Sequence, residues 1–335
     1  MANDKFAIDF DSAFTNIYML GSGLVLSEPT VAAVDEGGKG EVKAIGFEAN
    51  KLIGKTTKNT KTVFPVFEGE IVNEKVATEL LNGFLKKVGV GGKLFGMDCI
   101  FSVPCGIDYK MLEKYRKVAK NCGFSKISFI EAPILSALGQ RIPLSDSKPF
   151  FVIDMAGGTT NVAAVSLDGV IAGVSVNFGS NKICADIIDF VAERYNLQIG
   201  LLTADRLRKE IGSLDENDGL STVINGRNLK TGTPMALSIK ALDLIEPIKL
   251  YYDKVAEIAL SVLKKLPPEV SAEIRRSGIY LGGVSSSIYG LANYYSTKFD
   301  MQINLSENGL MAVALGGGVA LADNTMRKKI SLTVK

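Results

Sequence analysis

Residues 150–167 read FFVIDMAGGTTNVAAVSL, and this segment is the most informative one about the fold. Two apolar runs flank a single aspartate, Asp154, and a bend built from two glycines and two threonines. Burying a carboxylate is costly unless cations or several donors meet it, and a glycine bend offers unhindered backbone N–H groups to an anion. The combination indicates a phosphate site beside a carboxylate that faces a metal ion. The alternative is an ordinary hairpin, with strands at 150–153 and 161–167.

The composition describes an ordinary globular chain with room for two domains. It has 335 residues, of which 47% are hydrophobic and 22% charged. The net charge of +2 gives no overall field that would attract nucleic acid, so we expect no nucleic-acid partner. The start, MANDKFAIDF, has no signal-peptide pattern, and no apolar run is long enough to span a membrane. We therefore expect a cytoplasmic protein.

Several enzyme classes are excluded because the chain contains no histidine. Catalysis by a Ser-His-Asp or Cys-His arrangement is impossible, and proton transfer would fall to carboxylates, lysine, tyrosine or positioned water. The four cysteines form no CxxC pair, which disfavours a zinc site and predicts reduced, buried thiols.

The chain repeats one unit. FAIDFDSAFTNIYML, residues 6–20, and the opening stretch both run strand, aspartate, small-residue turn, threonine, strand. PLSDSKP, residues 143–149, marks a connection between the halves. The alternation of β-rich and helical runs favours an α/β fold, and two like domains would face each other across a cleft. The expected strands are 6–10, 15–20, 99–103, 126–130, 150–153, 162–167, 170–176 and 278–281. The expected helices are 73–88, 109–121, 133–139, 182–195, 203–211, 236–265 and 310–321.

An ordered set of motifs resembles the bacterial actins of the MreB/Mbl type, within the superfamily of actin, heat-shock chaperone and sugar kinase ATPases. The motifs are LSEPTVAAV (26–34), FPVFEGEIVN (64–73), FGSNKICADIIDFVAERYNLQIG (178–200), TADRLRKEIGSL (203–214), YLGGVSSS (280–287) and GLMAVALGGGVALA (309–322). The resemblance implies duplicated actin-like (ribonuclease H-like) domains around a nucleotide cleft. Domain I would comprise 1–148 plus 315–335, with a small subdomain at about 30–72. Domain II would comprise 149–314, with a small subdomain at about 184–243.

The resemblance also implies the ligands, ATP or ADP with Mg²⁺, and the residues that hold them. Asp9 and Asp154 would face the Mg²⁺ through waters, because this ion gives up its waters reluctantly. Asp205 and Arg208 would hold the ribose and adenine. The remaining nucleotide contacts would come from Ser12, Ala13, Gly157, Gly158, Thr159, Thr160, Gly179 and Gly283. Thr159 and Glu131 would be the catalytic residues.

Two departures from the family pattern bear on the chemistry. Asp11 stands where the first turn of relatives has glycine, and its carboxylate would repel phosphate, recruit magnesium or point outward. In FIEAPILSALG, residues 129–139, Ala132 stands where relatives have the carboxylate that orients the attacking water. Glu131 comes one residue early, and one step on a helix rotates a side chain by roughly 100°. We therefore expect a weak or impaired ATPase.

The resemblance predicts self-association into a homopolymer, including double protofilaments, on the inner face of the cell membrane. Leu94 and Phe95 lie at a glycine-flanked tip, where they would either insert into lipid or tuck back into the core. The basic tail MRKKISLTVK, residues 326–335, would be disordered or contact the membrane. A membrane adaptor or paralogous filament proteins would be further partners.

The expected function is therefore that of a cytoskeletal protein for cell shape or motility. The alternatives on the same fold are a small-molecule kinase and a heat-shock-type chaperone. A kinase needs a base for its acceptor and a substrate pocket built by insertions, and none stands out here. A chaperone needs a peptide-binding domain after the nucleotide domain. Sedimentation with and without ATP separates a filament from a kinase.

Overall fold

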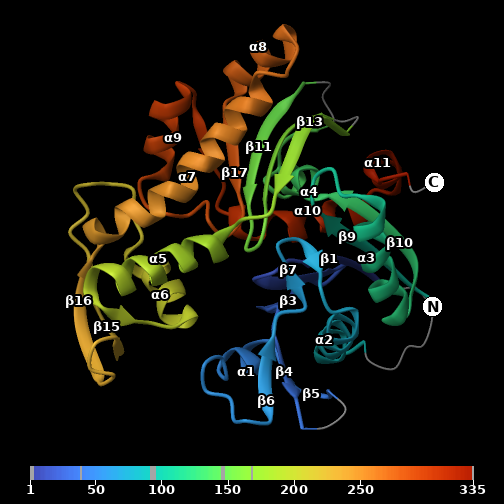
Figure 1. The fold of residues 1–335 in the computed structure, drawn as a ribbon. Helices are drawn as coiled ribbons and strands as arrows, with labels where there is room; N and C mark the ends of the chain where they lie inside the picture. Colours follow the sequence, from blue (N-terminus) through green and yellow to red (C-terminus); the bar gives the residue numbers. More distant parts are fainter. Residues whose placement is uncertain (1–3, 38–39, 91–95, 145–147, 167–168, 334–335) are drawn as a thin grey trace.

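Two five-stranded sheets form the centre of the protein in a computed structural model that describes residues 4–37, 40–90, 96–144, 148–166 and 169–333 (Figure 1). The strands of the first sheet, in spatial order, are β3 (Gly23–Pro29), β2 (Phe14–Met19), β1 (Lys5–Phe10), β9 (Met97–Val103) and β10 (Phe124–Glu131). Those of the second are β13 (Gly169–Val176), β12 (Thr160–Ser166), β11 (Phe150–Met155), β17 (Ile279–Gly282) and β18 (Ile303–Leu305).

The two sheets share one topology. In each, three antiparallel strands in chain sequence are followed by two strands parallel to the first of them. The hairpin β1–β2 therefore corresponds to β11–β12, as the repeated sequence unit predicts. The expectation of a duplicated α/β fold is confirmed.

Each half also carries a smaller, peripheral sheet. One contains β4 (Ala32–Asp35), β5 (Val42–Ile45) and β6 (Thr60–Val63), next to α1 (Phe47–Asn50). The other contains β14 (Leu197–Gln198), β15 (Ser221–Asn228) and β16 (Pro234–Lys240), next to α5 (Ser180–Tyr195) and α6 (Leu201–Ile211). The sheet of β4, β5 and β6 lies at the bottom of Figure 1, and the sheet of β14, β15 and β16 lies at its left. A hairpin of β7 (Val66–Phe67) and β8 (Glu70–Ile71) follows β6. The domain limits given above stay a prediction.

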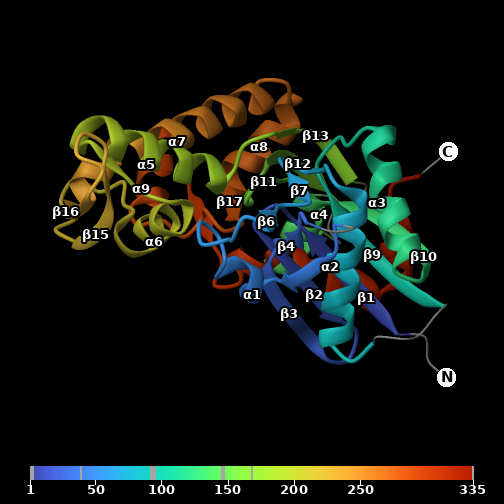
Figure 2. The same cartoon turned by 60° about the horizontal axis from the view of Figure 1, so that its bottom comes forward.

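Helices cover the sheets, and polar side chains fix where two of them begin. The Asn73 side chain accepts from the Val76 amide to start α2 (Glu74–Lys87), and Asp108 does the same from Met111 for α3 (Tyr109–Asn121). The other helices are α4 (Ala132–Gly139), α7 (Ala241–Leu263), α8 (Pro268–Ser277), α9 (Leu291–Phe299), a 3₁₀ turn at Gly309–Met311, α10 (Ala312–Ala322) and α11 (Asn324–Ile330). Figure 2 shows α2 and α3 on the same side of the first sheet.

Helices α4 and α10 cross in direct backbone contact between the two sheets. A Cβ placed on Gly139 would lie 1.8 Å from the carbonyl oxygen of Ala312, and one on Gly316 would lie 1.8 Å from that of Leu135. Helix α10 packs on the first sheet, where a Cβ on Gly317 would meet Ala7, and α4 packs on β11 and β12. Glycine at 139 and 316 is therefore what allows the two helices to approach so closely.

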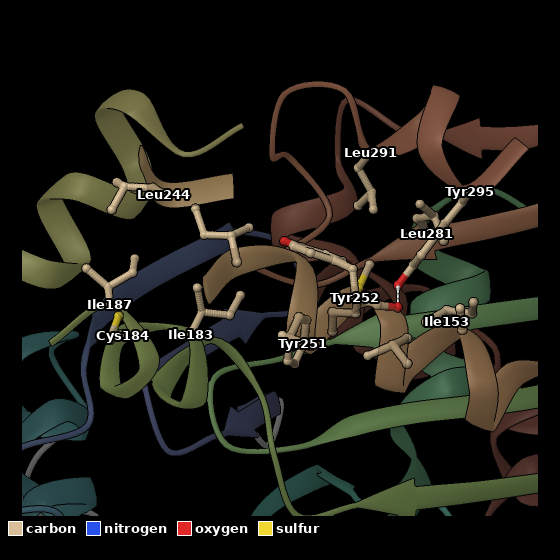
Figure 3. Close-up of a cluster of buried hydrophobic side chains, with 14 of the residues drawn as sticks. Ile153, Ile183, Cys184, Ile187, Leu244, Tyr251, Tyr252, Leu281, Leu291 and Tyr295 are labelled. Carbon is tan, nitrogen blue, oxygen red and sulfur yellow. Dashed lines mark hydrogen bonds between the residues drawn. The ribbon is translucent and has the colours of Figure 1, made fainter. Parts of the chain in front are cut away.

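Three buried tyrosines connect the core of the second half to its loops (Figure 3). The Tyr295 hydroxyl donates to the carbonyl oxygen of Tyr252 (3.0 Å), and the Tyr252 hydroxyl donates to that of Ser285 (2.7 Å). The Tyr251 hydroxyl pairs with the Thr160 hydroxyl at 2.8 Å. Helix α7 thereby fixes the loop that contains Ser285 and the start of β12.

The structure corrects two expectations. The helix expected over 236–265 begins only at Ala241, because Pro234–Lys240 forms strand β16. The tail is not a disordered basic end over its described part: Arg327 lies on α11 and is buried, with its guanidinium bonded to both carboxylate oxygens of Asp98. Leu94 and Phe95 lie outside the described residues. Within the described ranges, no helix has the length and apolar character needed to cross a membrane.

Candidate functional site

The two equivalent hairpins bring matching aspartate–asparagine pairs to one cleft. On the first, Asn16 lies opposite Asp9 and donates to its carboxylate at 3.1 Å. On the second, Asn161 lies opposite Asp154 and donates at 3.4 Å. The Ser102 hydroxyl adds a 2.8 Å bond to Asp9. Sequence reasoning missed both asparagines, although each follows its aspartate by seven positions in both copies of the repeat.

Asp9, Asp11 and Asp154 line one small cavity of about 50 Å³ between the halves. Burial is the main cause that raises the pKa of Asp9 to about 6 and that of Asp154 to about 7, and the neighbouring carboxylates raise both further. The pKa of Asp11 is also raised by burial, although backbone amides partly offset the effect. Carboxylates in this arrangement favour a nearby cation. Among the described residues, however, no three ligating side chains are grouped closely enough to hold a metal directly.

The turn after β1, at residues 11–13, and the glycine-containing turn after β11, at residues 156–159, touch each other across the cleft. A Cβ on Gly157 would lie 2.2 Å from the Ala13 Cβ, and a Cβ on Gly158 would lie 2.2 Å from the Ser12 hydroxyl oxygen. The Gly157 amide donates to the Asp11 carboxylate at 2.8 Å. Only glycine leaves room for a backbone approach of this kind, so the bend at 157–158 is built to present its amides.

A larger cavity of about 460 Å³ adjoins these turns. Ser12 and Ala13 line one side, and Asp205 and Arg208 of α6 line the other. Arg208 is buried, donates to Asp205 at 2.8 Å and to the carbonyl oxygen of Val284 at 3.4 Å. Pockets that take small organic ligands are usually ~300–1,000 Å³ in volume, so this cavity has the size for a nucleoside.

Several buried polar atoms without a partner line the two cavities. Among the described residues, the Ser12 hydroxyl, the Asn16 carbonyl oxygen, one Asp154 oxygen and the Arg208 Nε make no hydrogen bond. Other such atoms, for example Arg116 Nη2 and the Ser175 hydroxyl, line neither cavity. Buried polar groups are nearly always satisfied, so the four atoms at the cavities are available to bind a ligand. The residues present therefore fit a phosphorylated ligand and a hydrated cation.

The other residues expected at the site divide into two groups. Thr159 and Gly283 line the small cavity, and Gly283 has a φ of +83° that favours glycine. Gly179 packs against the backbone of residues 156 and 157 and supports the bend from behind. Thr160 lines neither cavity, because its hydroxyl bonds to Tyr251 and to the carbonyl oxygen of Phe178. The structure does not bring Thr160 to the site.

The cleft position at the start of α4 is occupied by alanine. Ala132 lines the small cavity, whereas the preceding Glu131 does not. The Glu131 carboxylate instead accepts a 2.6 Å hydrogen bond from the Gly106 amide. Glu131, the carboxylate nearest in sequence to position 132, is therefore bonded outside the small cavity.

The sequence profile of the MreB/Mbl protein family matches residues 3–329. The chain is 30% identical over 326 residues to the cell shape-determining protein MreB of Escherichia coli K12, covering 96% of this chain and 94% of that protein. Among solved structures, MreB5 of Spiroplasma citri bound to AMPPNP superposes with a TM-score of 0.92 at 25% identity, covering 98% of each chain.

A MamK double helical filament superposes with a TM-score of 0.78 at 17% identity, covering 96% of this chain and 99% of the other, which shows the shared fold. The actin-like architecture, the paired hairpins and the matched profile agree with one another. The chain belongs to the MreB/Mbl family of actin-like proteins.

Proposed function

We propose that the chain is a cytoskeletal protein that binds ATP or ADP with Mg²⁺ in the cleft between its halves and assembles into filaments. The observation that carries this proposal is the convergence of Asp9 and Asp154, from equivalent hairpins, on one cavity, where an oxygen of Asp154 and one of Asn16 lack a hydrogen-bond partner. The bound forms of MreB5, with AMPPNP and with ADP, support the same ligand class here.

In this proposal each group has a defined task. The nucleoside would occupy the larger cavity, where Asp205 and Arg208 supply a carboxylate and a guanidinium. The backbone amides of the two facing turns, at residues 11–13 and 156–159, would hold phosphate oxygens, and Asp9 and Asp154 would hold the ion through its waters. Mg²⁺, when bound, would neutralise the charge of the phosphates and of the buried carboxylates.

Hydrolysis is proposed to be slow because the cleft lacks a carboxylate at position 132. A water that attacks a phosphoryl group needs a partner that orients it, and single groups at such sites are worth about 10³–10⁵ in rate. Thr159 supplies a hydroxyl-bearing side chain to the lining of the small cavity, and Glu131 is bonded to the Gly106 amide. Nucleotide would then act as a switch, because a ligand held by both halves fixes the angle between them.

Assembly is proposed to take place on the inner face of the cell membrane, with the chain as its own main partner. Membrane adaptors and paralogous filament proteins are further proposed partners. Leu94 and Phe95 would supply apolar contacts with lipid, and a polymer would multiply weak contacts of this kind.

The test combines calorimetry with sedimentation. ATP and ADP, each with Mg²⁺, are titrated into the wild type, Asp154→Ala and the exposed control Asp189→Asn. We expect heat of binding and nucleotide-dependent pelleting for wild type and control, and weakened binding of Mg²⁺-nucleotide for Asp154→Ala. Absence of binding by the wild type, with no thermal protection, contradicts the proposal.

A further inference from the structure

Asp11 reaches across the cleft and ties the two halves together. It belongs to the turn after β1, but one of its carboxylate oxygens accepts from the Gly157 amide at 2.8 Å and from the Ala13 amide at 3.2 Å. The other oxygen accepts from the Gly158 amide at 3.4 Å. A single carboxylate therefore accepts hydrogen bonds from both glycine amides of the turn after β11.

Those two amides belong to the turn that the proposed function assigns to phosphate. The turn is held in place by its surroundings, because Gly157 contacts Ala13 and Gly158 contacts the Ser12 hydroxyl too closely for any larger residue. Adjacent backbone N–H groups of this kind form a concave site for anions. In this chain the anion that occupies the site is the carboxylate of Asp11 itself.

The sizes of the two cavities also indicate that Asp11 takes the place of a phosphate group. The cavity on the nucleoside side measures about 460 Å³, whereas the one lined by the three aspartates measures about 50 Å³. A water needs ~10–15 Å³ by this measure, so the smaller space holds a few waters. The cleft has room for a nucleoside, and Asp11 fills part of the space that a chain of phosphates would need.

The charged side chains that line the two cavities also disfavour additional phosphate groups beside Asp11. Asp9, Asp11 and Asp154 line the small cavity, and none of the described residues that line it is a lysine or an arginine. The cations of the site, Arg208 and Lys209, line the larger cavity. Each further phosphate group would therefore add negative charge beside Asp11, with only a bound cation to offset it.

We propose that Asp11 determines which nucleotide the cleft accepts: its carboxylate stands in for a phosphoryl group at the Gly157 and Gly158 amides, so the chain binds a nucleoside diphosphate in preference to the triphosphate. This inference rests on the proposed function. It adds that the discrimination depends on the number of phosphate groups and arises from one residue. Specificity of this kind works by repelling the competitor rather than by adding contacts to the favoured ligand.

The experiment measures dissociation constants for adenosine, ADP and ATP, the nucleotides with Mg²⁺, by calorimetry on the intact chain. The variants are Asp11→Gly, which restores room and removes charge, and Asp11→Asn, which keeps the size but removes the charge. Asp189→Asn, an exposed aspartate on α5, is the control for charge removal. Circular dichroism melts show that each variant is folded, and Asp11→Asn carries the test if Asp11→Gly does not fold.

The wild type and the control are expected to bind ADP more tightly than ATP by about tenfold, and Asp11→Gly is expected to abolish that preference by tightening ATP. Asp11→Asn is expected to move in the same direction, and adenosine affinity is expected to stay the same throughout. An unchanged ATP-to-ADP ratio in both Asp11 variants overturns the inference while leaving the proposed function standing. If neither the wild type nor any variant binds any of the three ligands, the proposed function itself fails.

Discussion

Replacing Arg327 with methionine is expected to destabilise the protein by removing one partner of a buried ion pair. The guanidinium donates to the two Asp98 oxygens at 2.9 and 2.5 Å, to the carbonyl oxygen of Cys99 at 3.0 Å and to the Ser128 hydroxyl at 3.1 Å. Arg327 is 8% exposed and Asp98 is 7% exposed, so solvent cannot compensate for the loss.

The magnitude follows from the carboxylate that is left behind. Removing one member of a buried pair costs about 3–5 kcal/mol, because the other charge stays desolvated without a partner. Total stabilities are ~5–15 kcal/mol, so this is a large share. Removing both charges, in Arg327→Met with Asp98→Asn, is expected to cost about 2 kcal/mol less than the sum of the two single changes.

The assay is urea denaturation followed by circular dichroism, on both single variants, the double variant and Lys328→Met. Lys328 is the exposed neighbour on the same helix, and its loss is expected to change the free energy of unfolding by less than about 0.5 kcal/mol. The reasoning is refuted if Arg327→Met costs no more than Lys328→Met, or if the double variant loses as much as the two single variants added together.

Three further outcomes are expected. Ala132→Glu, which adds a carboxylate to the small cavity, should raise the rate of phosphate release at saturating ATP, and an equal rate in wild type would show that position 132 is not what limits hydrolysis. Leu94→Ser combined with Phe95→Ser should reduce pelleting with anionic vesicles, and undiminished pelleting would exclude these two residues as the lipid contact. Gly139→Ala should lower the melting temperature far more than Gly219→Ala, because its Cβ meets a carbonyl oxygen at 1.8 Å whereas position 219 is open; equal effects would contradict close contact of α4 and α10.

Much of the architecture could be predicted from local sequence signals. The repeated aspartate hairpins gave the duplicated sheets, and the helix over 109–121 has the predicted bounds because Asp108 caps it. The start of α7 was predicted too early, although the residues from Met235 to Lys240 alternate in burial as a strand does. The strands β4, β5 and β6 of the peripheral sheet are each only four residues long and carry too short a pattern to be recognised.

The site was harder to predict, because its geometry depends on contacts between distant segments. Thr160 follows Thr159 directly, yet the alternation of a strand turns one toward the cleft and the other toward Tyr251. The direction of Asp11 depends on amides 146 and 147 positions away. Asp98, the partner of Arg327, lies 229 positions earlier in the chain. The sequence alone therefore does not distinguish an exposed basic tail from one whose arginine is buried in an ion pair.

The crossing of α4 and α10 has a mechanical consequence. Since the two backbones touch at Gly139 and Gly316 with no side chain between them, the halves have little freedom to slide there and must instead roll about that point. The crossing is thus a hinge point that lies closer to the cleft than to the outer sheets. A slight widening between the two facing turns of the cleft would be magnified at the far edges, β5 and β16, in proportion to their distance from the crossing.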